Sequence, residues 1–334
     1  MAASSSQPVS PAAAVSADMF TSEPSAAHAR VLHTSYRDRM RRHFLGALGS
    51  AAEGLQVDLS PLVSRIEALS LPTRLSPAAY VELSQLSDAL QSGDVTRVTD
   101  RLQGLSNLSQ ADLCDARLRI GPVLTERWET DFIPTVRSDP ADGRSQSARL
   151  VRALIGQDAS PSVEACAYAL DLLSEVDPDL FAEFQEYVVR VKIFAGRGYL
   201  GFSSPAAFGA LFIRLPEGDP VEHFLEHLVH ELSHSSLNVL MAHDPLLRNP
   251  QGEAQAPLRS DVRPLYQVFH ATFVLNRNVR VMRRAHARHP DRGYEEGLAH
   301  FEAKYREGLE EIEARAEFTP LGERLFRSFE PASA

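Results

Sequence analysis

Residues 219–242 read DPVEHFLEHLVHELSHSSLNVLMA, and this stretch predicts a long helix. Asp219 can cap its amino end, Pro220 suits the first turn, and Glu222 stands where a capping-box carboxylate reaches back. Apolar residues recur along the stretch at helical spacing. Histidines recur at spacings of four, three and four, at His223, His227, His230 and His234. We therefore expect a helix with one apolar side and one side that carries histidines.

The pentapeptide His230-Glu231-Leu232-Ser233-His234 is an HExxH motif in the middle of this helix. Two histidines four residues apart on a helix point in the same direction and can bind one metal ion. Glu231 can act as a base or can support the metal ligands from outside. The capped helix start and the short apolar strand predicted before it favour a metal site. The alternative is a histidine-rich helix face that is simply solvated.

An open catalytic metal site generally needs a third protein ligand. The metzincin continuation is excluded, because it needs Gly and His where this chain has Leu237 and Leu240. Glu253 lies in a loop, without a helix to aim it. His270 is the better candidate, since residues 264–274 are compatible with a helix and place it among apolar neighbours. Its alternative role is that of a hydrogen-bonded core histidine.

Helix signals dominate the rest of the chain, and the clearest strand candidate is 207–215. The segment 186–194 fits either a second strand or the end of a helix. We expect a mainly α fold with a small β element (α+β), in which a zincin-like active-site helix lies within a helical fold. The expected regions are a disordered tail rich in Ala, Ser and Pro (1–25), a helical N-terminal region (26–140) and an HExxH metal-binding catalytic region (141–330).

The composition excludes several classes of partner. The chain has 334 residues and a net charge of −10, which leaves no basic surface for nucleic acid. It contains two cysteines, outside any CxxC pair, and it lacks both a signal-like start and a long apolar run. We expect a cytoplasmic, soluble protein with no nucleic-acid or membrane partner; its oligomeric state stays open.

Three motifs together resemble a known family. They are LVHELSH at 228–234, APLRSDVRPL at 256–265, and His270. This pattern is similar to that of the bacterial HExxH-type 2-oxoglutarate- and Fe(II)-dependent peptide β-hydroxylases, which modify ribosomally synthesised peptides. The middle motif of the family reads approximately Ala-Pro-Trp-Arg-x-Asp-Pro-Arg-Pro, so this chain departs from it at Leu258 and Val262. The resemblance spans about residues 195–285.

The resemblance implies an iron centre and an oxygenase reaction. Fe(II) would be held by His230, His234 and His270. One oxygen atom of O₂ would enter a β C–H bond of a precursor peptide, while 2-oxoglutarate, the co-substrate, is decarboxylated to succinate. Glu231 would then have a supporting role instead of that of a base.

The distal carboxylate of 2-oxoglutarate calls for an arginine, whose planar guanidinium can bind it in a bidentate manner. Arg263 and Arg277 lie seven residues before and after His270, on roughly the same helix face. Arg263 belongs to the family motif and is the preferred candidate, with Arg259 and Asp261 as neighbours that orient it or the residues around the metal. For each of these residues the alternative is a surface ion pair.

The HExxH motif alone leaves two other functions open. In a zinc metallopeptidase, Glu231 is the general base that deprotonates the attacking water. The same imidazoles accept zinc readily, so zinc is the alternative metal. A helical binding protein without catalytic activity is the third hypothesis.

Overall fold

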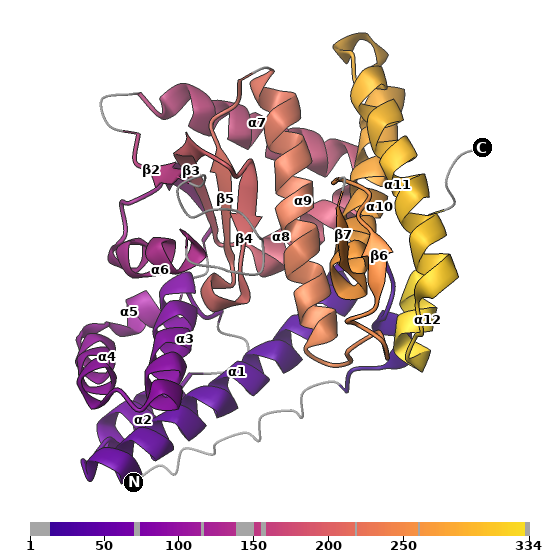
Figure 1. Cartoon of the computed structure of the whole chain (residues 1–334). Coiled ribbons are helices and arrows are strands. Elements are labelled where there is room, and N and C mark those ends of the chain that lie inside the picture. Colours follow the sequence, from indigo (N-terminus) through magenta and orange to yellow (C-terminus); the bar gives the residue numbers. More distant parts are fainter. Residues whose placement is uncertain are drawn as a thin grey trace, which may run out of the picture.

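The computed structural model describes residues 14–69, 74–114, 117–137, 150–154, 158–217, 219–259 and 261–330. Within these ranges the chain is mainly helical and carries one small sheet and one short hairpin (Figure 1). The expected mainly α fold with a small β element is therefore confirmed. No helix of the described ranges is long and apolar enough to cross a membrane.

The N-terminal helices form a layer with a core of its own (Figure 1). Ser76 caps one helix by accepting from the Ala79 N–H, and Gly93 ends the same helix with a φ of 67°. The long first helix is shared between two cores, because Phe44 packs in the N-terminal layer whereas Leu32 packs in the main core. These helices are α1 (Ala26–Leu55), α2 (Ser60–Glu67), α3 (Pro77–Ser92), α4 (Val95–Asn107) and α5 (Gln110–Leu113). The boundary expected near residue 140 falls at 138–149, outside the described residues.

Residues 14–25 are ordered, although we expected them to belong to a disordered tail. They contain a short 3₁₀ helix, Ala17–Met19, and the Phe20 side chain is only 1% exposed. The Ser22 N–H donates to Ser328 Oγ at 2.7 Å, which fixes the segment to the C-terminal end of the chain. The expectation of disorder was wrong here because one buried aromatic residue offsets the polar composition. The rest of the predicted tail, 1–13, lies outside the described residues.

The sheet has the strand order β1-β3-β5-β4. Its first three strands are parallel, β4 pairs with β5 in the antiparallel sense, and β2 pairs with β3. The strand expected within 207–215 is confirmed as β5, and 186–194 divides into the end of α8 and the start of β3. The elements are β1 (Arg119–Pro122), α6 (Arg127–Arg137), β2 (Leu150–Arg152), α7 (Ser160–Val176), α8 (Pro178–Tyr187), β3 (Arg190–Arg197), β4 (Gly201–Ser203), η4 (Pro205–Ala207) and β5 (Ala210–Arg214).

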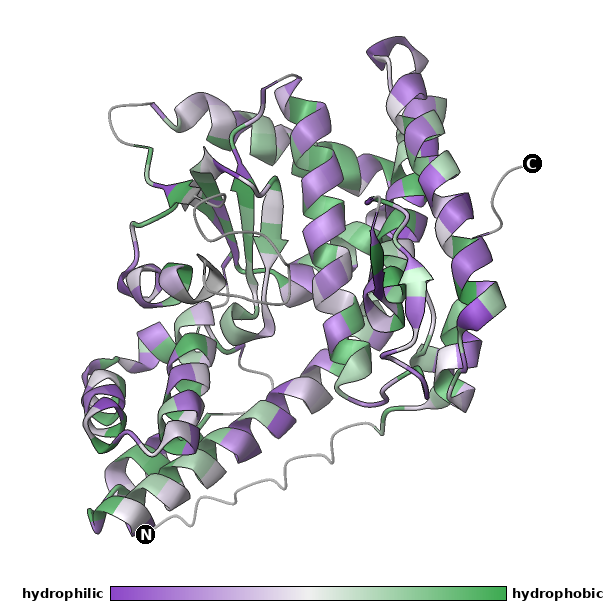
Figure 2. Ribbon diagram, in the orientation of Figure 1, coloured by the Kyte–Doolittle hydropathy of each residue, from purple (hydrophilic) through white to green (hydrophobic). Residues whose placement is uncertain are grey.

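The helix with the HExxH motif, α9 (Pro220–Met241), lies between the sheet and α10 (Leu265–Arg288). Asp219 caps it by accepting from the Val221 and Glu222 N–H groups at 2.8 and 3.2 Å, as the sequence predicts. Figure 2 shows hydrophobic residues gathered in β3 and β5 and on the inward sides of the helices. The remaining elements are β6 (Glu253–Gln255), β7 (Val262–Pro264), η5 (Pro290–Arg292), α11 (Glu295–Arg315) and α12 (Pro320–Arg327).

Arg277 lies in the core and not in the candidate site. Its guanidinium, only 2% exposed, pairs with the Glu183 carboxylate of α8 and donates to Ser236 Oγ at 3.1 Å. Its Nε donates to the Ser22 carbonyl oxygen at 3.2 Å. Because these partners occupy the guanidinium, the expectation that Arg277 binds a co-substrate was wrong. The residue instead joins α8, α9, α10 and the N-terminal segment.

We expect Arg277→Ala to lower the free energy of unfolding by about 3–5 kcal/mol, because it leaves Glu183 buried without its cation. The matched control on the same helix is Arg288→Ala, which removes an exposed ion pair with Glu175 and should change stability little. Urea unfolding followed by circular dichroism measures both effects. Equal losses in the two variants would contradict a structural role for Arg277.

Candidate functional site

His230 and His234 form a preformed pair on α9. Their Nε2 atoms lie 3.2 Å apart. Two imidazole nitrogens that bind one tetrahedral metal at 2.0–2.1 Å are separated by about 3.3 Å, so this spacing suits a shared metal ion. The pair arises directly from the helix, since residues four apart fall on one face.

His270, on α10, lies next to this pair. Its Nδ1 is 3.3 Å from His234 Nδ1, and its Nε2 is 3.0 Å from Met241 Sδ. His234 thus turns one nitrogen to His230 and the other to His270. For this reason, within the described residues, no group of three His, Cys, Asp or Glu side chains is already arranged around one metal position. The three imidazole rings lie side by side, but only those of His230 and His234 turn a nitrogen toward a common position.

The three rings provide neutral nitrogen donors. Burial is the main cause that lowers the pKa of His234 to about 4 and that of His270 to about 3. Burial, followed by the charges of His234 and His227, holds the pKa of His230 well below its usual range. A neutral imidazole has a free lone pair on one nitrogen, which is the form that binds a metal.

Glu231 is buried against the strand β4. Ser203 Oγ donates to its Oε2 at 2.8 Å. A Cβ atom added at Gly201 would come within 2.8 Å of Glu231 Oε1 and 3.2 Å of the Phe212 carbonyl oxygen. Burial raises the pKa of the Glu231 carboxyl to about 8. Glu231 therefore fixes the position of β4 relative to α9, and Gly201 leaves space for the Glu231 side chain.

A cavity of about 470 Å³ adjoins the histidines on the side of α10. Its walls include all three imidazoles together with Arg259 and Arg263. Asp261 pairs with the Arg263 guanidinium at 2.6 Å, and Arg263 Nε is buried without a hydrogen-bond partner among the described residues. The cavity thus combines nitrogen donors for a metal with two guanidinium groups for an anion.

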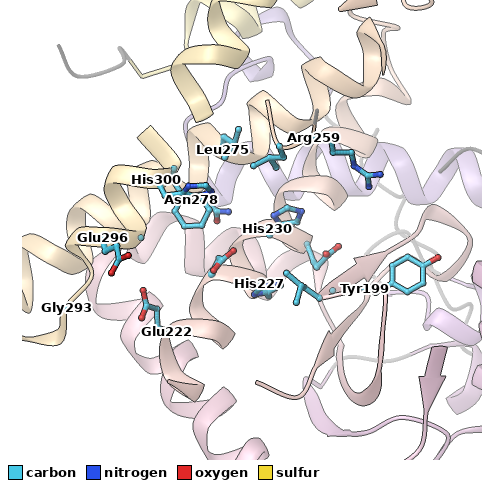
Figure 3. Close-up of a pocket in the computed structure, with 18 residues that line it drawn as sticks. Tyr199, Glu222, His227, His230, Arg259, Leu275, Asn278, Gly293, Glu296 and His300 are labelled. Carbon is cyan, nitrogen blue, oxygen red and sulfur yellow. The ribbon is translucent and has the colours of Figure 1, made fainter. Parts of the chain in front are cut away.

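A second cavity, of about 760 Å³, lies on the other side of His230 (Figure 3). It shares His230, Leu258 and Arg259 with the first cavity. Its other walls come mainly from residues 198–201 and from α9, α10 and α11. They include four carboxylates, those of Glu222, Glu226, Glu231 and Glu296, and the imidazoles of His227 and His300. Figure 3 shows Glu222, Glu296 and Asn278 gathered on one side of His230, with Arg259 on the other.

The structure thus brings together most of the residues expected from the sequence: His230, Glu231, His234, Arg259, Asp261, Arg263 and His270. Sequence reasoning missed Glu222 and Glu226 as site residues, although Glu222, Glu226 and His230 follow one another at steps of four residues, which was a usable signal. It also missed Ser203 and Asn278, because no local sequence pattern places them beside α9.

No family model matches this chain, and no curated protein matches it significantly. The site is therefore characterised by its own geometry, a histidine pair at the junction of an arginine-lined and a carboxylate-lined cavity. Such a junction has room for a metal ion, a small anion and a further ligand at the same time.

We expect the protein to bind one Co²⁺ ion with the visible absorption of a low-coordinate nitrogen site. His230→Ala and His234→Ala should abolish this spectrum, because each removes half of the preformed pair. His270→Ala should weaken binding about 10–100-fold. His43→Ala, on α1 and outside both cavities, is the control and should bind like the original protein. An unchanged Co²⁺ affinity in His230→Ala would contradict the site.

Gly201→Ala should lower the free energy of unfolding by about 1–3 kcal/mol, because the new Cβ collides with Glu231 and a strand carbonyl. Gly46→Ala is the control, since its Cβ would meet no atom within 4 Å on the exposed face of α1. Replacing that helical glycine should stabilise the protein by about 0.5–1 kcal/mol. Chemical denaturation of both variants measures the difference, and a Gly201→Ala protein of undiminished stability would refute the close approach.

Proposed function

We propose that the protein is an Fe(II)- and 2-oxoglutarate-dependent oxygenase that hydroxylates the β-carbon of a residue in a ribosomally synthesised peptide. The observation that carries the proposal is the cavity of about 470 Å³, in which three neutral imidazoles and two arginines share one wall. A metal alone does not need the arginines, and an anion alone does not need the imidazoles. A 2-oxo acid bound to a metal needs both.

His230 and His234 would hold the metal through Nε2, and His270 would complete the ligand set after a turn of its ring away from Met241. Bound iron supplies the activation of dioxygen. The overall reaction balances as peptide C–H, O₂ and 2-oxoglutarate giving peptide C–OH, succinate and CO₂. In this proposal, α9 beside the strand β4 would serve as a zincin-like active-site helix.

Arg263 and Arg259 would bind the distal carboxylate of 2-oxoglutarate. Asp261 accepts from Arg263 and so limits the orientations of that guanidinium. Arginine suits this task because it presents two parallel N–H donors to one carboxylate. In this arrangement the imidazoles would face the reacting end of the co-substrate, and the arginines would bind its other end.

The peptide would lie along β4. Within the described sheet, β4 is an edge strand, whereas β5 is paired on both sides. Gly201 of β4 lines the larger cavity, so a strand added at this edge would pass the His230–His234 pair. Glu231, held by Ser203, keeps the edge in place and has a positioning role.

A zinc metallopeptidase is the competing outcome. It would use Glu231 to deprotonate a water molecule, but it has no need of two arginines beside the imidazoles. Anaerobic reconstitution with iron, followed by 2-oxoglutarate, a candidate precursor peptide and air, separates the two. We expect succinate and a peptide heavier by one oxygen atom. Peptide cleaved in the presence of zinc, with no succinate in the presence of iron, would overturn the oxygenase.

Arg263→Lys and Arg259→Lys should raise the KM for 2-oxoglutarate about tenfold or more, because lysine keeps the charge and loses the bidentate geometry. The effect on kcat should be smaller, since the arginines bind the end of the co-substrate that does not react. Arg288→Lys, on the exposed surface of α10, is the matched control. Steady-state succinate formation measures these constants, and an unchanged KM in both variants would exclude the anion site.

A further inference from the structure

The larger cavity carries an excess of negative charge that the fold leaves uncompensated. Glu222 and Glu226 lie one helical turn apart on α9, and Glu296 lies opposite on α11. Within the described residues, none of these three carboxylates forms an ion pair. The helices meet closely here, because a Cβ atom added at Gly297 would lie 3.2 Å from Glu222 Oε1. Arg259 is the single guanidinium in the described wall, at the end shared with the smaller cavity.

Asn278 is an independent sign of a ligand in this cavity. It projects from α10 into the wall, and its side chain is only 1% exposed (Figure 3). Neither its Oδ1 nor its Nδ2 has a hydrogen-bond partner in the described part of the chain. A buried amide without partners is costly, so native proteins rarely retain one unless something else satisfies it. A ligand with both N–H donors and a carbonyl acceptor would satisfy both atoms.

Burial, followed by the charge of Glu222, raises the pKa of Glu226 to about 7. Burial and Asp219 raise the pKa of Glu222 as well. Neither carboxylate has a counter-charge among the causes of its pKa shift within the described residues. A cation in the cavity would supply it, and its N–H groups would also reach Asn278 Oδ1.

The two cavities thus have opposite electrostatic character and meet at His230. One side is lined by arginines and suits a dianion, and the other is lined by carboxylates and an amide. A peptide that enters from the β4 edge reaches the carboxylate side, because Gly201 and Leu200 line that cavity.

We propose that the larger cavity binds the cationic side chain of an arginine or lysine in the peptide, at or next to the hydroxylated position. The carboxylates bind the cationic group, Asn278 Oδ1 accepts from it, and Asn278 Nδ2 donates to a peptide carbonyl. This assignment rests on the proposed function for the identity of the reaction, but the binding itself is separable from it.

The test uses the full chain loaded with zinc, which fills the metal site without supporting the oxygenase reaction. Fluorescently labelled pentapeptides of glycine with a central arginine, lysine, glutamine or glutamate are titrated by fluorescence anisotropy. We expect the arginine and lysine peptides to bind about tenfold or more tightly than the glutamine peptide, as charge-assisted hydrogen bonds predict. Equal affinities for arginine and glutamine would overturn the proposal.

Glu226→Gln and Glu296→Gln should each abolish most of this preference without changing the affinity for the glutamine peptide. Glu310→Gln is the matched control, because it removes an exposed carboxylate from the same helix as Glu296, outside the cavity. Glu296 is exposed, so its variant should fold even if Glu226→Gln does not. Equal loss of preference in Glu310→Gln would show a general effect of net charge and would overturn the site.

The outcomes distinguish this inference from the proposed function. Selective binding of basic peptides without succinate formation in the iron protein supports the acidic cavity and overturns the oxygenase. Succinate formation with a peptide that lacks basic residues, together with no preference in the titration, supports the oxygenase and overturns the acidic cavity.

Discussion

The packing of α9 between the sheet and α10 is the constraint on which the site depends. Leu228, Val229 and Leu232 are fully buried in the main core, so the helix cannot rotate about its axis without exposing them. With that face fixed, the helical repeat alone turns His230 and His234 to one side and brings their Nε2 atoms to 3.2 Å. The same repeat places Glu226 about one turn and Glu222 about two turns before His230, on the side of the second cavity. One buried helix therefore sets the positions of both the His230–His234 pair and the carboxylates of Glu222 and Glu226.

Local sequence patterns predicted where helices form, but they did not predict which segments pack or pair with one another. The Asp219-Pro220 start of α9 was predictable because the cap and the first turn are decided within four residues. The parallel pairing of β1, β3 and β5 joins segments separated by long stretches of chain, and no local pattern encodes it. The order of residues 14–25 was missed for a similar reason, because Phe20 and Ser22 are held by partners at the opposite end of the chain.

The candidate site shows the same division. The i, i+4 rule was sufficient to place His230 and His234 side by side. The sequence motif was sufficient to place Arg263 in the cavity wall and Asp261 beside it. Helical spacing failed for Arg277, because it gives the face of the helix but not its neighbours, and that face meets Glu183. Ser203 and Gly201 lie next to Glu231 only because strand β4 pairs within the sheet, which local sequence does not encode. The lack of a hydrogen-bond partner for the Asn278 amide among the described residues likewise depends on how the helices pack.

The central claim is that one metal, held by the histidine pair, binds a 2-oxo acid whose far end reaches Arg263 and Arg259. An anaerobic titration of the Fe(II)-loaded protein with 2-oxoglutarate, followed by visible absorption, tests it most directly. The account predicts a charge-transfer band that saturates at one equivalent of 2-oxoglutarate, is absent with succinate and needs more 2-oxoglutarate in Arg263→Lys. A protein that binds iron through His230 and His234 but gives no band with 2-oxoglutarate would contradict it.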